Sequence, residues 1–460
     1  MGMQVVQNNK LQKPPVDQVK KIKIHLGVFF DGTKNNKFNI TEYNKRDHSK
    51  WWIQEPVKRT KWTLNDSYKR EFTNVAKLFE VYDIDKKEEI IYKRIYVEGI
   101  ATAPRENEND PGGSDSMTAA ATGMGPYGVN GKVERACRLV GEKIQSIIKS
   151  QPEQIEITVE ELQLDVFGFS RGATAARRFV SCIEKASGDI IRQQGGYISL
   201  YMVSLRDRIK QLQLKVENIY PHFMGLFDTV SSYGFNFTDD VKELTLHVRL
   251  PKFVVQFAAA DEYRKNFALT RIKSANSNQV ELLLPGDHCD VGGSYNKDMT
   301  EKTVITPEKI IYSGGDYYKI PPVYNGYKSL EKLLEEGWII DKTEKERVVS
   351  NEYSSIPLMM MGKYAEEKRT TFFSDDLMDV KIPNDLTALK KRLDGLKGNP
   401  LYCFATDGNQ EYIEPAYQNG DSDFELLRSI RHKYLHLSAQ GGLVNGPAKN
   451  NKRLIIDDTK

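Results

Sequence analysis

The stretch from Val166 to Ala173 contains the pattern Gly168-x-Ser170-x-Gly172, which constrains the fold of this chain more than any other feature. Residues 162–167 alternate between apolar and polar and then become continuously apolar, which is typical of a buried parallel strand. Residues 171–183 are rich in alanine and favour a helix. A serine on so sharp a strand-to-helix turn presents its hydroxyl above the sheet. The pattern predicts a nucleophilic serine, and the alternative is an ordinary tight turn.

Strands and helices alternate along the first 300 residues. Apolar runs predict further strands at 22–30, 90–97, 222–230 and 280–284. Amphipathic or helix-forming segments predict helices at 74–82, 132–149, 201–216 and 254–267. This alternation predicts an α/β fold with a mainly parallel central sheet flanked by helices. Beyond Gly293 the pattern changes to helical pieces separated by loops, at 330–336, 357–367, 385–397 and 424–437.

Composition excludes several classes of protein. Lys and Arg number 66 against 63 Asp and Glu, so the bulk charge gives no sign of a nucleic-acid partner. The four cysteines form no CxxC pair, which indicates reduced thiols and no zinc site, and nothing indicates another metal or a cofactor. The first twenty residues lack the apolar core of a signal peptide, and no later run is long enough to span a membrane. We expect a soluble protein, made in the cytoplasm without a signal peptide.

An acyl-transfer serine needs a base and a carboxylate that orients the base. Asp228 stands near the end of the predicted strand 222–230, and His288 follows the strand 280–284 in a glycine-flanked loop. The order Ser170, Asp228, His288 is that of α/β-hydrolases. The sequence therefore predicts an α/β-hydrolase-like fold with a catalytic triad of these residues.

The chain contains other histidines that could serve as the base. His436, near the end of the last helical segment, is the serious rival to His288. His432 and His436 are four residues apart, a spacing that suits a metal but more often marks an ordinary helix face. The alternative for His288 is a metal ligand beside Asp287 and Asp290, although one histidine with two carboxylates has no specific spacing.

The oxyanion of an acyl-transfer reaction needs backbone N–H donors. The strand 22–30 ends in a polar turn, where the N–H of Gly32 or Thr33 can join that of Arg171. The alternative is a turn with an aspartate cap. We also expect an apolar groove near the serine, lined by the glycine-rich loop 103–131 and by the helix 201–216 acting as part of a lid.

An insertion at 39–70 differs in character from its surroundings. It carries Trp51, Trp52 and Trp62, and between Lys45 and Arg70 it has eight basic residues but three acidic ones. Tryptophan beside Lys or Arg suits contact with an anionic membrane surface. The alternative is that these rings pack beneath a surface loop.

Four motifs in order resemble a known family. They are Phe30-Asp31-Gly32-Thr33, Gly168-Phe169-Ser170-Arg171-Gly172-Ala173, Phe227-Asp228-Thr229-Val230 and Pro285-Gly286-x-His288-x-Asp290-Val291-Gly292-Gly293. Together they resemble the Tle-type phospholipase effectors of the bacterial type VI secretion system. The resemblance implies a lipase that attacks phospholipid acyl esters with Ser170, Asp228 and His288. It also implies delivery on a secretion spike or tube component into a target-cell periplasm, and a cognate immunity protein.

The chain is expected to divide into a disordered arm (1–20), an α/β-hydrolase catalytic domain (21–300), a helical and loop-rich C-terminal addition packed on the core (301–445) and a polar tail (446–460). The favoured function is a serine-dependent phospholipase of A type, an antibacterial effector acting on target-cell membranes. Two alternatives are a soluble carboxylesterase that does not act on bilayers and a non-catalytic hydrolase-fold module for binding or delivery. Activity on bilayers distinguishes the phospholipase from the carboxylesterase. Reactivity of Ser170 distinguishes both enzymes from the non-catalytic module.

Overall fold

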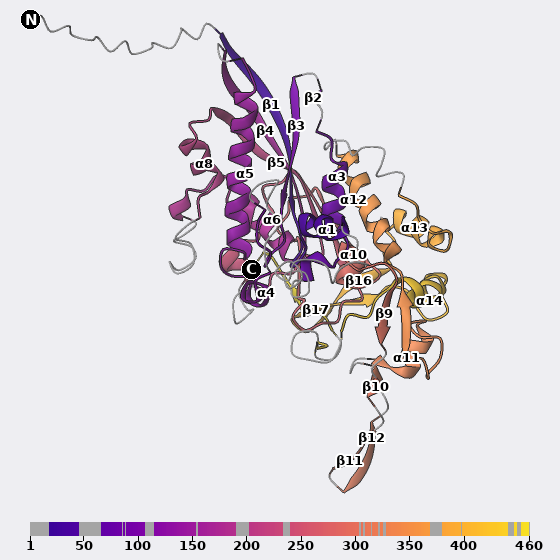
Figure 1. Cartoon of the computed structure of the whole chain (residues 1–460). Helices are drawn as coiled ribbons and strands as arrows, with labels where there is room; N and C mark the ends of the chain where they lie inside the picture. Colours follow the sequence, from indigo (N-terminus) through magenta and orange to yellow (C-terminus); the bar gives the residue numbers. More distant parts are fainter. Residues whose placement is uncertain are drawn as a thin grey trace, which may run out of the picture.

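A seven-stranded sheet forms the centre of the computed structural model, with strand order β2-β3-β1-β4-β5-β6-β8 (Figure 1). The structure describes residues 18–45, 66–84, 86–87, 89–105, 115–152, 155–189, 202–232, 240–302, 305–306, 309–313, 315–320, 323–324, 328–368, 380–396, 398–439, 446–448 and 452–459. Trp51, Trp52 and Trp62, and most of the predicted N-terminal arm, lie outside these residues.

The sheet is parallel except at one edge, where β2 runs antiparallel to β3. Its strands are β1 (Gln18–Phe30), β2 (Lys86–Lys87), β3 (Ile90–Val97), β4 (Ile155–Phe169), β5 (Val216–Phe227), β6 (Phe253–Ala259) and β8 (Gln279–Leu284). Phe30 pairs with Gly168 and Phe169 with Phe227, so the carboxyl ends of the central strands meet at one edge. Ligands of open α/β sheets bind at such an edge. The predicted mainly parallel sheet is confirmed.

Helices cover both faces of the sheet (Figure 1). On one face lie α5 (Val129–Lys149), α6 (Arg171–Ser181) and α8 (Leu205–Gln211), whose apolar residues share a buried cluster with one side of the strands. On the other face, α3 (Asn74–Val81) packs against β1 and β3, and α12 (Ser355–Glu367) packs against β5 and β6. The carboxyl-terminal parts of the central strands β1, β4, β5 and β6 are therefore buried on both sides, as their near-continuous apolar sequences require.

Shorter elements surround this core. The helical ones are α1 (Lys37–Asn44), η2 (Asp66–Tyr68), α4 (Met117–Thr122), α9 (Asp240–Leu244), α10 (His288–Gly292), α11 (Leu330–Glu335), η3 (Asn351–Ser354), η5 (Asn384–Leu386), α13 (Thr387–Asp394) and α14 (Ser422–Tyr434). The strands are β7 (Leu269–Thr270), β9 (Met299–Lys302), β10 (Ile305–Thr306), β11 (Lys309–Ser313), β12 (Asp316–Ile320), β13 (Val323–Tyr324), β14 (Lys328–Ser329), β15 (Glu346–Val349), β16 (Tyr402–Asp407), β17 (Gln410–Pro415) and β18 (Ile455–Ile456).

Two predictions about secondary structure were wrong. Residues 254–267 were expected to form a helix, but their first part is the central strand β6, because a short apolar run fits a buried strand as well as a buried helix. Residues after 445 were expected to form only a polar tail. Instead β18 pairs with β7, and Arg453 and Asp458 are each only 3% exposed. The physical reason is that each charged side chain has a charged partner inside the core, Asp228 for Arg453 and Arg177 for Asp458.

Candidate active site

Ser170 stands between β4 and α6, at the carboxyl edge of the sheet. Its backbone has φ 60° and ψ −132°, a conformation that L residues seldom adopt and that costs about 1–3 kcal/mol. Gly172 permits the turn, because a Cβ there would lie 2.2 Å from the carbonyl oxygen of Asp31. The Ser170 N–H donates to the carbonyl of Phe227 at 3.0 Å, which ties the turn to the next strand. The elbow predicted from the glycine spacing is present as a strained, supported turn.

Asp228 is the first residue after β5 and is completely buried. Its Oδ2 lies 2.6 Å from Nδ1 of His288, and its Oδ1 accepts from the N–H of Ala259 at 2.8 Å. The N–H of Asp228 donates to the carbonyl of Phe257 at 2.7 Å. Strand β6 thus fixes both the backbone and the carboxylate of Asp228, so the carboxylate can fix the orientation of the imidazole.

His288 is the first residue of α10, and Asp287 caps this helix. The Asp287 side-chain oxygen Oδ1 accepts from the N–H groups of Cys289 and Asp290 at 2.9 and 3.0 Å. The imidazole of His288 lies against the ring of Phe169, with 4.6 Å between centroids, and meets the ring of Phe267 edge-on. Burial lowers the pKa of His288 below its ordinary value, despite the opposing effect of Asp228. The imidazole is therefore neutral near pH 7, the form that a general base requires.

Arg453 reaches Asp228 from the C-terminal segment. Its Nη1 and Nη2 lie 2.8 Å from Oδ1 and Oδ2 of Asp228, which makes a two-point contact. The same guanidinium donates to the carbonyls of Ala259 and Phe267. Burial alone would raise the pKa of Asp228, but the charge of Arg453 and the hydrogen bonds from His288 and Arg453 outweigh burial and hold that pKa below the ordinary aspartate value. Sequence reasoning missed Arg453, because a single arginine in a polar segment carries no motif.

The segment 261–264 supports His288 from the other side. Glu262 accepts from the backbone N–H of His288 at 3.4 Å and pairs with Arg264 at 2.6 Å. Burial would raise the pKa of Glu262, but Arg264 outweighs it and the pKa lies below the ordinary glutamate value. Asp261 accepts from the N–H of Gly286 at 2.8 Å. This ion pairing anchors the loop that carries His288.

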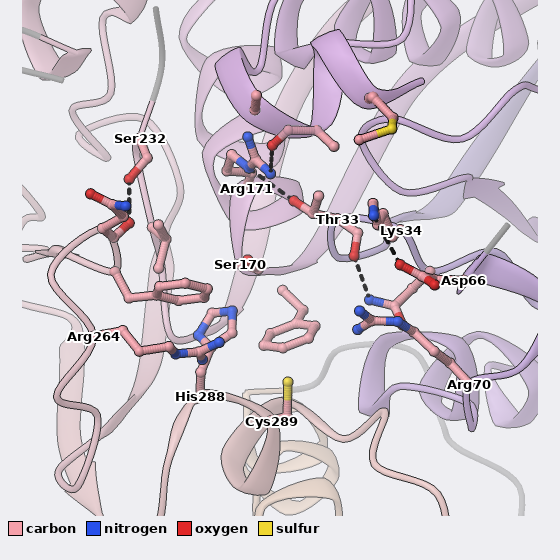
Figure 2. Close-up of a pocket in the computed structure, with 18 residues that line it drawn as sticks. Thr33, Lys34, Asp66, Arg70, Ser170, Arg171, Ser232, Arg264, His288 and Cys289 are labelled. Atoms are coloured by element: carbon pink, nitrogen blue, oxygen red, sulfur yellow. Dashed lines mark hydrogen bonds and ion pairs between the residues drawn. The ribbon is translucent and has the colours of Figure 1, made fainter. Parts of the chain in front are cut away.

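Ser170 and His288 line one cavity of about 610 Å³ (Figure 2). The remaining lining residues are Thr33, Lys34, Asn35, Asp66, Arg70, Met117, Ala120, Ala121, Phe169, Arg171, Val230, Ser232, Arg264, Asn266, Phe267 and Cys289. The glycine-rich loop contributes to the wall through α4, as expected. The lid predicted from 201–216 was wrong, since α8 packs against α5 and supplies no lining residue. An amphipathic helix buries its apolar face on any apolar surface, and its sequence does not say which.

The predicted oxyanion donors fall into two groups. Arg171 and Thr33 line the cavity, whereas Gly32 does not, and the Gly32 N–H donates to Oδ1 of Asp31 at 2.7 Å. For the N–H groups of Arg171 and Thr33, no acceptor is found among the residues that the structure describes. Two backbone N–H donors on the wall of the cavity thus remain available to a substrate oxygen. One belongs to Thr33, in the turn after β1, and the other to Arg171, the first residue of α6.

His436 occupies a different environment from His288. It is completely buried, its Nδ1 lies 2.7 Å from Oδ1 of Asp290, and its ring stacks on Tyr295 at 3.7 Å. It is not among the residues that line the cavity. His432 faces Glu344 at 2.7 Å. The two histidines that the sequence placed four residues apart therefore serve separate contacts within the C-terminal region.

Among the residues that the structure describes, no group of three or more His, Cys, Asp or Glu side chains is arranged to hold a metal ion. None of the helices in the described part of the chain is both long enough and apolar enough to cross a bilayer.

The sheet and its serine turn define an α/β-hydrolase-like protein, and a solved structure shares the whole fold. The structure described as the Tle1 effector bound to the VgrG spike from the Type 6 secretion system matches with a TM-score of 0.59, at 20% identity over 98% of both chains. A crystal structure of an uncharacterized protein from Pseudomonas aeruginosa matches with a TM-score of 0.38, at 18% identity over 83% of this chain and 52% of that one. No curated protein matches the sequence.

The family model for the catalytic domain of the Tle1-like phospholipase effectors of the type VI secretion system matches residues 25–310. The chain belongs to this family, which confirms the resemblance of its four motifs. It is a phospholipase effector with a lipolytic hydrolase domain.

Proposed function

We propose that this protein is a serine-dependent phospholipase that hydrolyses acyl esters of phospholipids in the membranes of a target cell. The observation that carries the proposal is the 2.6 Å contact between Asp228 and His288, with His288 and Ser170 on the wall of one cavity. Asp228 holds a proton on Nδ1 of the imidazole, which leaves Nε2 to accept the proton of Ser170. Family membership supplies the lipid substrate class.

In the proposed mechanism, Oγ of Ser170 attacks the ester carbonyl while its proton passes to Nε2 of His288. The N–H groups of Arg171 and Thr33 stabilise the oxyanion, and each such donor contributes roughly 10²–10³ in turnover. The C–O bond to the glycerol then breaks, and His288 returns the proton to the leaving alkoxide, which departs as a lysophospholipid. Water, deprotonated by His288, hydrolyses the acyl-serine and releases a fatty acid.

The proposed delivery route follows from the family and from one solved relative. The Tle1 structure with the same fold is described as bound to the VgrG spike. We propose that this chain also travels on a spike component into the target periplasm, and that the producing cell makes an immunity protein. Co-purification of the chain with the spike protein of its own secretion cluster tests this route, and the absence of a complex at micromolar concentrations would contradict it.

Lipid product analysis tests the chemistry. Purified protein incubated with phosphatidylethanolamine and phosphatidylglycerol liposomes is expected to release fatty acid and lysolipid, and Ser170→Ala is expected to release neither. Hydrolysis of a soluble short-chain ester without any release from liposomes would support a carboxylesterase instead. Failure of wild-type Ser170 to react with a fluorophosphonate probe would support a non-catalytic module.

A further inference from the structure

Positively charged side chains outnumber negatively charged ones on the cavity wall. Four cationic side chains, those of Lys34, Arg70, Arg171 and Arg264, line the cavity, and Asp66 is the one acidic side chain among its lining residues. Lys34 pairs with Asp66 at 2.9 Å, and Arg264 pairs with the buried Glu262. The two pairs leave the charges of Arg70 and Arg171 in excess.

Arg171 is held by neutral groups. Its Nε donates to Oγ1 of Thr33 at 2.9 Å, and its Nη2 donates to the carbonyl of Ala120 at 2.6 Å (Figure 2). Burial lowers the pKa of Arg171 to about 10, so the side chain stays charged at neutral pH. No carboxylate contacts it among the described residues, and Nη1 has no acceptor there. A desolvated guanidinium without a counter-ion beside the proposed nucleophile is costly unless a ligand supplies the anion.

Arg70 adds a second such charge. It is half-buried on the cavity wall, and Figure 2 shows it on the same side of the cavity as Lys34 and Asp66. The hydrogen bond from Lys34, with a smaller effect of Arg70, lowers the pKa of Asp66. No hydrogen bond or ion pair joins Arg70 to a carboxylate in the part of the chain that the structure describes. Its guanidinium is therefore available to an anion in the cavity.

We propose that Arg171 and Arg70 form a subsite for the phosphodiester of a glycerophospholipid, next to the serine. This inference rests on the proposed function and adds the part of the substrate that is recognised. Guanidinium groups bind phosphate oxygens through paired N–H donors. In a glycerophospholipid the glycerol joins the scissile ester to the phosphate through a few bonds, so the phosphate must lie close to Ser170. Met117, Ala120 and Ala121 of α4 give the same cavity an apolar wall for the acyl chain.

Binding to an inactive protein tests the subsite separately from turnover. In the Ser170→Ala background, calorimetry is used to compare monomeric dihexanoyl phosphatidylcholine with dihexanoylglycerol, which has the same esters but no phosphate. We expect the phospholipid to bind more tightly, and Arg70→Gln to weaken its binding roughly 10- to 100-fold without affecting the glyceride. Arg171→Gln should have a similar effect. Arg138→Gln on α5, a cation away from the cavity, should change nothing.

Several results would overturn the subsite. Equal binding of the phospholipid and the glyceride would do so, and so would Arg70→Gln and Arg171→Gln proteins that bind the phospholipid as the parent does. Inorganic phosphate that binds at least as tightly, with the same sensitivity to Arg70→Gln, would assign the site to free phosphate. Loss of the proposed function has a different signature, because there the wild-type protein releases no fatty acid whatever the binding result.

Discussion

Arg453 donates to both carboxylate oxygens of Asp228 at 2.8 Å, in addition to the hydrogen bonds that Asp228 makes with the N–H of Ala259 and with His288. An acid that orients a catalytic histidine must remain ionised and immobile, and here the guanidinium contributes to both, together with the N–H of Ala259. The exposed fraction of the Arg453 side chain is 2% and that of Asp228 is zero, so solvent hardly screens the pair. Arg453 is thus a positioning residue for the proposed triad.

Replacing Arg453 with glutamine should reduce both stability and turnover. Removing one partner of a buried pair costs about 3–5 kcal/mol, so we expect a loss of about that size in the free energy of unfolding. We expect kcat to fall roughly 100-fold, because a small displacement of a catalytic group has an effect of that order. Chemical denaturation and the kinetics of ester hydrolysis measure the two effects.

The pH profile separates positioning from general damage. Burial lowers the pKa of His288 below its ordinary 6.5, so the acid limb of kcat/KM in the wild type should have its midpoint below that pH. In Arg453→Gln a cation near the imidazole is lost, the imidazolium becomes easier to form, and the midpoint should move to higher pH. Asp458→Asn is the matched control, since it breaks the other buried pair of this segment, with Arg177, without touching Asp228. An unshifted limb in Arg453→Gln would contradict the positioning role.

The strained turn at Ser170 predicts a difference in stability between two inactive variants, Ser170→Gly and Ser170→Ala. Glycine adopts φ 60° without steric cost, whereas alanine keeps the Cβ that causes the strain. Relief of about 1–3 kcal/mol of strain exceeds the loss of about 0.4–1 kcal/mol from the more flexible unfolded chain. We expect Ser170→Gly to unfold at a higher denaturant concentration than Ser170→Ala, with no hydrolysis by either. A Ser170→Gly protein less stable than Ser170→Ala would show that the turn stores no such strain.

The two buried histidines should behave differently when each is replaced by glutamine. His288→Gln removes the proposed base, so labelling of Ser170 by a fluorophosphonate should drop by roughly 10³-fold or more. His436→Gln leaves Asp290 with a weaker partner, so it should lower the free energy of unfolding while the folded protein still labels. Labelling rates below the melting transition of each variant provide the measurement. Labelling lost in His436→Gln and retained in His288→Gln would reverse the assignment of the base.

Asp287 predicts a pH-dependent stability. Burial, with the charges of Asp290 and Glu262, raises its pKa to about 8, whereas the unfolded chain has the ordinary 3.8. The stability that depends on the protonated carboxyl is complete below pH 3.8 and is lost as the pH rises toward about 8. Asp287→Asn keeps an oxygen for the cap and does not ionise. Its stability relative to the wild type should therefore increase between about pH 5 and about pH 8 in denaturation experiments.

Asp287→Ala is the companion variant for this experiment. It removes the cap of α10 altogether, so it should be less stable than Asp287→Asn by about 1 kcal/mol at either pH. A stability difference between wild type and Asp287→Asn that does not change with pH would contradict the raised pKa.

Local patterns in the sequence predict the residues of the candidate site that stand at strand ends, and the structure brings these residues to one edge of the sheet. Ser170, Asp228 and His288 each follow an apolar run that becomes a strand, and the ends of parallel strands meet at one edge of the sheet. The predictions of the fold and of the family also depend on local patterns, the alternation of strands and helices and the four ordered motifs, and both were confirmed. Arg453 carries no such pattern, because its role depends on β18 pairing with β7, a contact that neither short strand encodes alone. The packing partner of α8 was predicted wrongly, because an amphipathic sequence shows that one face of a helix is buried but not which element that face packs against.

The late position of Arg453 affects the order in which the site is assembled during synthesis. The serine, the acid and the histidine all leave the ribosome before the residue that clamps the acid. Until Arg453 has been added to the chain, the carboxylate of Asp228 lacks this counter-charge. For a phospholipase effector, full activity would thus be acquired only once the segment that carries Arg453 has been synthesised and packed against β7.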